Sequence, residues 1–302
     1  REQHANKKQT PMWTLAQARA NKTPIDWSQG VPSAPKFIGR RVFKNYDLAE
    51  IAQYIDWGPF FQTWDLAGPY PAILDDEIVG EQARQVFADG QAMLKKVIEG
   101  RWLTAHAVFG LFPAAQVNDD DIAIHSEPPM VWHGLRMQTE RPVVEGMKRP
   151  NRCLSDFVAP KGTGIADHVG AFSVTSGLGL GDRLQAFKDD LDDYSAIMLK
   201  ALADRLAEAA AEWLHQQVRS EFWGYAKDEQ LDNDALIREE YRGIRPAPGY
   251  PACPELEDRV KLIELLKPEL IGVTLSEELQ LHPEQSTDAM VLHHPEAKYF
   301  SV

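Results

Sequence analysis

A long amphipathic helix is the clearest pattern of apolar and polar positions in the chain. Its apolar stripe comprises Leu191, Tyr194, Met198, Leu202, Leu206, Ala209 and Trp213. These three- and four-residue steps follow the helical repeat of about 3.6 residues and predict roughly six turns with one face in the core. On another face stand Lys200, Asp204, Glu208 and Glu212, four residues apart, which we interpret as ordinary solvated side chains.

Shorter patterns predict strands in the middle of the chain and helices around them. The strands are expected over residues 105–113, 121–125, 130–138 and 172–175. The further helices are expected over 47–55 with Asp47 as N-cap, 75–99, 232–241 and 255–266. Strands joined by turns, with helices on either side, predict an α+β fold with an antiparallel sheet.

The first 36 residues differ from the rest because they are polar and interrupted by prolines. They also carry Trp13, Leu15 and Trp27, whose apolar surface favours docking over free solvation. We therefore expect an N-terminal arm, residues 1–36, packed on a body formed by residues 37–302.

Composition excludes several classes of function. The net charge of −13 argues against a nucleic-acid partner, because phosphate binding requires clustered Lys and Arg. Cys153 and Cys253 lie too far apart for a Cys-x-x-Cys zinc site and are too few for a disulfide scaffold. The chain begins with polar residues and has no run of eighteen apolar ones, so we expect a cytoplasmic protein with no membrane partner.

A proline-rich segment, residues 239–255, is the strongest candidate for a binding site. Its four prolines, at positions 246, 248, 251 and 254, each fix φ and remove an N–H, so the segment must be a stiff extended loop. Between them lie Arg245, Gly249 and Tyr250, which supply a five-donor guanidinium, a permissive backbone position and an aromatic hydroxyl. A plain connector would explain the prolines but not these three residues.

Other motifs in the sequence give weaker evidence of a function. The glycines of Gly177-Leu-Gly-Leu-Gly181 do not fit a dinucleotide fingerprint and predict a strand-to-helix turn. His293 and His294 are adjacent, so in a strand they would point to opposite faces, and we expect no metal site there. No nucleophile with a base is evident, and we assign no catalytic residue. An arginine with acids such as Asp56, Glu208 and Glu239 suits a zwitterionic ligand.

The loop Arg-Pro-Ala-Pro-Gly-Tyr-Pro-Ala-Cys-Pro-Glu, residues 245–255, resembles the S-adenosylmethionine-binding loop of the activation domain of cobalamin-dependent methionine synthase. Further stretches look like the same domain, in its order: residues 54–61, 110–114, 153–160, 170–175 and 198–215. The resemblance covers essentially the whole chain. It implies a single C-shaped α+β domain with a central twisted antiparallel sheet and flanking helices.

The resemblance also implies a ligand site. Asp56 matches the acid that holds the methionine amino group, and Arg245 matches the loop arginine that bonds the ligand. The remaining positions carried over are Ala247, Gly249 and Tyr250 in the loop and the acids Glu208 and Glu239. Val291 and Leu292 are also predicted to bind the ligand, near the adenosine. The family commonly has a Tyr-Phe pair at these two positions, so we expect the substitution to affect ligand affinity.

In that family the domain reactivates the enzyme when its cobalamin has drifted to the cob(II)alamin state. A flavodoxin-type protein or equivalent reductase supplies an electron, and S-adenosylmethionine supplies the methyl group, in the biosynthesis of methionine. The cobalamin-ligating Asp-x-His-x-x-Gly motif is absent from this sequence, so cobalamin would be carried by another domain, and zinc only by a separate one. Two alternatives stay open: a free-standing S-adenosylmethionine-dependent methyltransferase, and a flavodoxin-docking module without ligand turnover.

Overall fold

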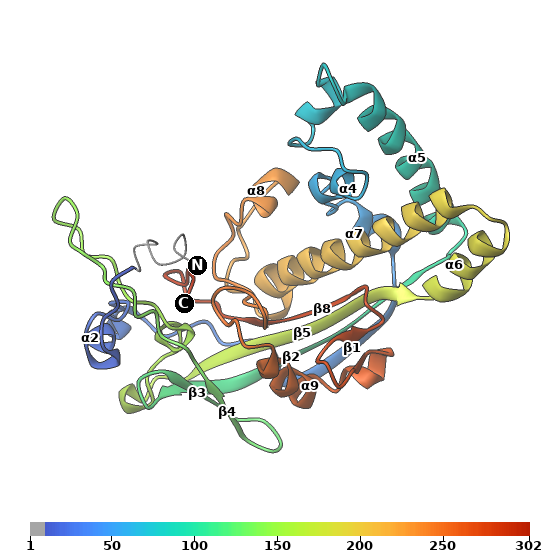
Figure 1. Ribbon diagram of the computed structural model, residues 1–302. Coiled ribbons are helices and arrows are strands. Elements are labelled where there is room, and N and C mark those ends of the chain that lie inside the picture. The colour runs from blue at the N-terminus through green and yellow to red at the C-terminus, as the bar shows by residue number, and fades with distance from the viewer. Residues whose placement is uncertain (1–9) are drawn as a thin grey trace.

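A curled antiparallel sheet organises the chain in the computed structural model, which describes residues 10–302 (Figure 1). Its strands are β1 (Gly39–Tyr46), β2 (Thr104–Val117), β3 (Asp121–Ile124), β4 (Met130–His133), β5 (Asp167–Leu178) and β8 (Ser286–Val291). The order is β4-β3-β2-β5-β8, and β1 also pairs with β2. Because β2 is long, β1 pairs with its first half and β3 with its last residues. The predicted antiparallel sheet is confirmed.

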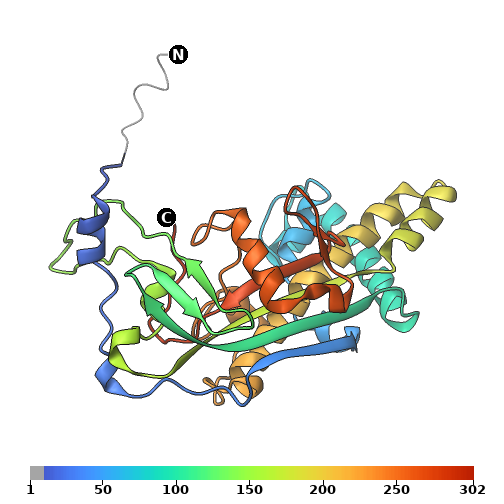
Figure 2. The ribbon, with the colours of Figure 1, turned by 90° about the horizontal axis from the view of Figure 1, so that it is seen from below.

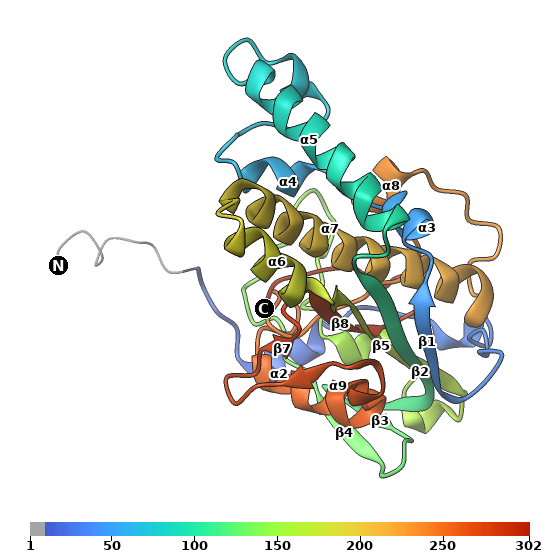
Figure 3. The same cartoon turned by 90° about the vertical axis from the view of Figure 1, so that its right-hand side faces the viewer.

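Helices cover the sheet on both faces because its central strands alternate between two apolar cores. Phe109 and Leu111 of β2 pack with α7 (Asp193–Gln217), whereas Val108 and Phe112 pack with α9 (Arg259–Leu266). Figure 3 shows α6 (Leu180–Asp189) alongside α7, and α9 on the other side of the sheet. The predicted long helix is confirmed as α7, and its stripe from Met198 to Trp213 is in the core. The first two predicted positions were wrong, because Leu191 precedes the helix and Tyr194 in its first turn is also exposed.

The remaining elements extend this frame. They are α2 (Leu15–Ala20), η1 (Trp27–Gln29), α3 (Leu48–Ala52), α4 (Gly58–Gln62), η2 (Ala72–Asp75), α5 (Gly80–Glu99), η3 (Leu154–Phe157), η4 (Lys161–Thr163), the π-helical turn η5 (Val218–Phe222), α8 (Asn233–Ile237), η6 (Leu256–Asp258), η7 (Pro268–Ile271), β6 (Thr274–Leu275) and β7 (Leu281–His282). In Figure 1, α4 and α5 rise away from the sheet beyond α7, and the molecule has the expected C-shaped outline.

Several sequence predictions need correction at this level. The first strand, β1, was not predicted, because its residues are mostly exposed and charged and show no apolar alternation. The strand predicted over residues 130–138 ends at His133. The turn at Gly177–Gly181 is confirmed: Gly179 adopts a φ of +90° between β5 and α6, a conformation that favours glycine.

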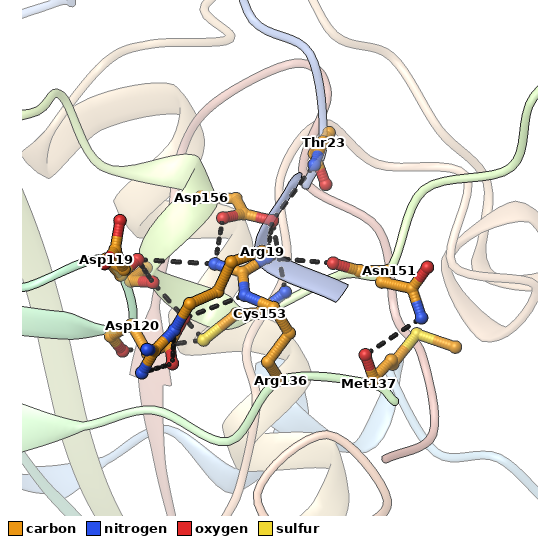
Figure 4. Close-up of polar contacts among 10 residues, drawn as sticks. Arg19, Thr23, Asp119, Asp120, Arg136, Met137, Asn151, Cys153 and Asp156 are labelled. Atoms are coloured by element: carbon orange, nitrogen blue, oxygen red, sulfur yellow. Dashed lines mark hydrogen bonds and ion pairs between the residues drawn. The ribbon is translucent and has the colours of Figure 1, made fainter. Parts of the chain in front are cut away.

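Residues 10–36 run along the end of the sheet opposite α6, beside the loop over 134–152 (Figure 2). Trp13 N–H donates to the Gln138 carbonyl, and Asn21 contacts Asn151 through its side chain. Arg19 joins a buried ion-pair network around Arg136, shown in Figure 4. The predicted arm begins at residue 1, and its first nine residues lie outside the described part of the chain. None of the helices within residues 10–302 has the length and apolarity to cross a membrane.

Candidate functional site

The proline loop forms one wall of a cavity of about 450 Å³. The opposite walls come from α7, the start of β8 and the C-terminal segment. The lining residues used below are Glu208, Ala211, Glu239, Tyr241, Arg245, Ala247, Tyr250, Arg259, Asp288, Tyr299 and Phe300. This volume falls within the range of small-molecule sites, roughly 300–1,000 Å³.

The loop is fixed to the sheet by backbone hydrogen bonds. No helix or strand is formed between α8 and η6, and the predicted extended loop is confirmed. Ile244 and Leu292 exchange both backbone hydrogen bonds, each 2.9 Å long, and Met290 N–H donates to the Pro246 carbonyl. Gly249 N–H donates to the Cys253 carbonyl, with Gly249 at a φ of +90°. The loop is therefore a rigid wall that extends the edge at β8.

Arg245 projects from this wall and is held by neighbours. One terminal nitrogen donates to Glu212 Oε2 at 2.5 Å, and the other donates to His215 Nδ1 at 2.9 Å. Burial alone would lower the pKa of Arg245, but the surrounding acids and tyrosines raise it, so the guanidinium stays charged. About 20% of its side chain remains exposed, on the cavity. Donors of a permanent cation therefore remain accessible to a ligand.

Glu212 and His215 are functional candidates that the sequence reasoning missed. Glu212 was expected on a solvated helix face, but it is 8% exposed because the loop places Arg245 across α7. His215 is fully buried, and burial together with the nearby guanidinium groups of Arg219 and Arg245 lowers its pKa well below the usual value. It is therefore neutral. The spacing alone could not show this, since nothing in α7 itself marks its contact with a loop about thirty residues later.

The two predicted acids at this site lie at the rim of the cavity. Glu208 is exposed one turn before Glu212, and Glu239 is exposed at the end of the α8 segment. Burial raises the pKa of Glu239, an effect that Arg245 opposes and Glu212 reinforces. Glu239 also has a φ of +60°, an uncommon conformation for a residue other than glycine that recurs at functional sites.

The aromatic pair near the cavity is Tyr299-Phe300, whereas the predicted binding positions Val291 and Leu292 do not line it. Val291 and Leu292 are each 1% exposed, and their side chains belong to the two cores on either side of the sheet. Leu292 acts instead through its backbone, which pairs with Ile244. Tyr299 and Phe300 line the cavity, and a Tyr-Phe dipeptide was visible in the tail.

Tyr299 links the C-terminal segment to the loop. Its hydroxyl accepts the backbone N–H of Arg245 at 3.0 Å and lies 2.6 Å from the Tyr241 hydroxyl. The ring of Tyr241 lies 5.4 Å from the guanidinium carbon of Arg245. The aromatic residues therefore fix both the backbone and the side chain of Arg245.

Of the loop residues that the resemblance assigns to the ligand site, some line the cavity and one shapes the loop beside it. Ala247 and Tyr250 line the cavity, and Tyr250 is 62% exposed at its rim. Gly249 is exposed beside them and shapes the turn. The Ala247 carbonyl already accepts Tyr250 N–H and the Cys253 thiol, so its N–H is the group left for a ligand.

Asp56 is not brought to this cavity. It lines a separate hollow of about 680 Å³ between α3, η2, α5 and α8, where its Oδ1 accepts the N–H of Gly58 at 3.0 Å. The two hollows adjoin at the end of α8, since Arg238 lines one and Glu239 the other. The predicted role of Asp56 would therefore require a ligand that reaches past this rim.

The far wall of the cavity carries a second charged pair. Arg259 of α9 lies 3.2 Å from Asp288 of β8. Burial raises the pKa of Asp288 to about 6, although Arg259 opposes that effect. Among residues 10–302, no group of three or more His, Cys, Asp or Glu side chains is arranged to hold a metal ion, and both cysteines are free and buried.

Comparison with known proteins places this cavity in a family. The family model for the activation domain of vitamin B12 dependent methionine synthase matches residues 47–302. The chain belongs to this family. It is also similar to a crystal structure of the MetH reactivation domain bound to AdoHcy, with a TM-score of 0.89 and 46% identity over 97% of this chain and 90% of that chain. The expected family and fold of this activation domain are therefore confirmed.

Proposed function

We propose that this activation domain binds S-adenosylmethionine in the cavity beside the proline loop and presents the methyl group to cobalamin carried by another domain of methionine synthase. The observation that carries the proposal is the partly exposed side chain of Arg245, held at the wall of a cavity with acids at its rim. The similarity to a domain bound to AdoHcy, the demethylated product of the same ligand, supports it.

The charges in the cavity suit such a ligand. Arg245 can donate two parallel hydrogen bonds to the carboxylate of an amino-acid group, and such charge-assisted bidentate pairs are among the strong hydrogen bonds in proteins. Glu208 and Glu239 place negative charge at the rim, where it would favour the ammonium and the sulfonium. Tyr299 and Phe300 supply aromatic surface for the adenosine. When bound, S-adenosylmethionine supplies a methyl group activated by its positively charged sulfur, so the chain need only position it.

The electron for reactivation is proposed to come from a flavodoxin-type protein that docks on the basic edge of the sheet. Four exposed basic residues lie in β1 or just before it: Lys36, Arg40, Arg41 and Lys44. Residues 136–152 are also rich in Arg and Lys, but Arg136 is buried in ion pairs and cannot contribute. Binding that weakens with salt and with reversal of Arg41 and Lys44 to glutamate would support this surface. Unchanged binding would exclude it.

The ligand proposal is tested by isothermal titration of S-adenosylmethionine into the chain. We expect one site per chain, and we expect Arg245→Ala to weaken binding by roughly 10–150-fold, the equivalent of about 1.5–3 kcal/mol for a charged hydrogen bond. Exposed Arg149→Ala is the matched control and should bind like the unmodified chain. Equal affinity of the Arg245→Ala variant would contradict the proposal. Methyl transfer to a small acceptor without cobalamin would favour the free-standing methyltransferase.

A further inference from the structure

One face of α7 surrounds the guanidinium of Arg245 from the protein side. Glu208, Ala211, Glu212 and His215 follow one another at steps of three, one and three residues and so share one face of the helix. Glu208 and Ala211 line the cavity, whereas Glu212 and His215 are buried behind Arg245. One face of α7 therefore lines the cavity in front of the Arg245 guanidinium and also contacts the guanidinium from the buried side.

The contacts of Glu212 and His215 are not explained by stability alone. Each has one buried polar atom, Glu212 Oε1 and His215 Nε2, with no hydrogen-bond partner within the described residues. Such unpaired buried atoms oppose folding, and buried ion pairs are often no more stable than apolar residues of the same size. A buried carboxylate and a buried imidazole at this place therefore call for a role in the site.

Their contacts fix the plane of the guanidinium. Arg245 donates one hydrogen bond from each of its two terminal nitrogens, to Glu212 and to His215. Because the guanidinium is planar and rigid, two such bonds set its orientation and leave its other N–H groups directed elsewhere. Arg245 can only donate, so His215 Nδ1 must accept, and the imidazole is neutral with its proton on Nε2.

We propose that Glu212 and His215 are positioning residues that hold the Arg245 guanidinium in the orientation that receives a ligand carboxylate. This inference rests on the proposed function, since it assumes a ligand with an amino-acid group in the cavity. Glu212 has a second effect, because its negative charge offsets that of Arg245 and leaves the rim acids Glu208 and Glu239 to set the charge of the cavity. A cationic sulfonium fits such a cavity.

The test compares two ligands by isothermal titration. S-adenosylhomocysteine carries the carboxylate, whereas 5′-methylthioadenosine has the same nucleoside and sulfur without the amino-acid group. We expect Glu212→Leu and His215→Leu to weaken S-adenosylhomocysteine binding by about tenfold or more, and to leave 5′-methylthioadenosine within about twofold. Glu212→Gln keeps an acceptor oxygen and His215→Gln supplies one in place of Nδ1, so both should recover part of the loss. Exposed Glu99→Gln on α5 is the matched control.

The outcomes separate the possible roles. Equal weakening of both ligands would show that Glu212 and His215 merely hold the fold, and would overturn the inference, as would unchanged binding of both. Thermal unfolding of each variant separates a loss of the fold from a loss of the Arg245 orientation, and we expect Glu212→Gln to unfold at the temperature of the unmodified chain. If the unmodified chain binds neither ligand, the proposed function fails together with this inference. If it binds both and Arg245→Ala alone loses S-adenosylhomocysteine, the proposed function stands and this inference fails.

Discussion

Replacing Arg136 with methionine should destabilise the domain by about 3–5 kcal/mol, the typical effect of leaving a buried charge without its partner. The side chain of Arg136 is fully buried. It forms two hydrogen bonds to Asp156, of 2.7 and 2.9 Å, and one to Asp120 of 2.8 Å (Figure 4). Without it, Asp156, whose side chain is 2% exposed, would keep only two backbone N–H donors, from Thr23 and Cys153.

A matched variant lies in the same network. Arg19 also bonds Asp120, at 2.7 and 2.9 Å, but its side chain is 38% exposed and Asp120 would retain Arg136. Arg19→Met should therefore destabilise the domain much less than Arg136→Met does. Both substitutions remove one guanidinium, so the difference between them measures burial.

Urea unfolding followed by circular dichroism measures both free energies. For a chain of 302 residues, the loss at Arg136 corresponds to a decrease in Tm of about 5–8 °C, from an unfolding entropy of about 2.1 cal/mol/K per residue. Asp156→Asn should be less severe than Arg136→Met, because the amide is neutral. If the free energy of unfolding of Arg136→Met were within about 0.5 kcal/mol of that of the unmodified chain, the buried acids would not depend on Arg136 and the reasoning would be refuted.

Three further results are expected. Gly243→Ala should lower the free energy of unfolding by about 2–4 kcal/mol, because a Cβ there would lie 2.4 Å from the Leu292 carbonyl oxygen at a φ of +80°. Gly146→Ala is the control, since Gly146 has a φ of +76° with open space around it, and should lower that free energy by about 1 kcal/mol. Equal urea midpoints of the two variants would contradict this difference. Asp288 has a pKa raised from 3.8 to about 6 on folding, so its contribution to stability is complete below pH 4 and is lost as pH rises through 6; the difference between the unmodified chain and Asp288→Asn should therefore fall by about 1–3 kcal/mol over that range, and a flat difference would refute it. Tyr299→Phe, which removes the acceptor of Arg245 N–H, should lower stability by about 1–2 kcal/mol and weaken S-adenosylmethionine binding, and unchanged titration heats would exclude that role.

The proline loop could be predicted from sequence because its constraints are local. Each proline acts on its own φ and N–H, and Gly249 does adopt the positive φ that only glycine takes without strain. The long helix α7 was equally predictable, since its apolar stripe repeats through the whole element. In both cases the information lies within the segment itself.

The contacts within the site were less predictable because they join segments far apart in sequence. Glu212 lies in a row of acids whose spacing favours a solvated face, and only the position of Arg245 makes it buried. Strand β1 pairs along β2 although its exposed charges hide any alternation. Tyr299-Phe300 reaches the cavity only because the C-terminal segment returns beside the loop.

Asp56 shows the limit of transferring single positions. Its residue type fits the predicted ammonium partner, but this structure places it in the adjoining hollow. Whether a ligand reaches both hollows depends on its pose and on the rim at Glu239, neither of which follows from sequence spacing. Its role stays a prediction.

A crystal structure of this chain with S-adenosylhomocysteine tests the central claim most directly. We predict the ligand in the cavity between α7, the proline loop and Tyr299, with its carboxylate within hydrogen-bond distance of the Arg245 guanidinium. The same density would show whether the ammonium reaches Asp56. A ligand bound elsewhere, or one whose carboxylate points away from Arg245, would contradict the proposed site.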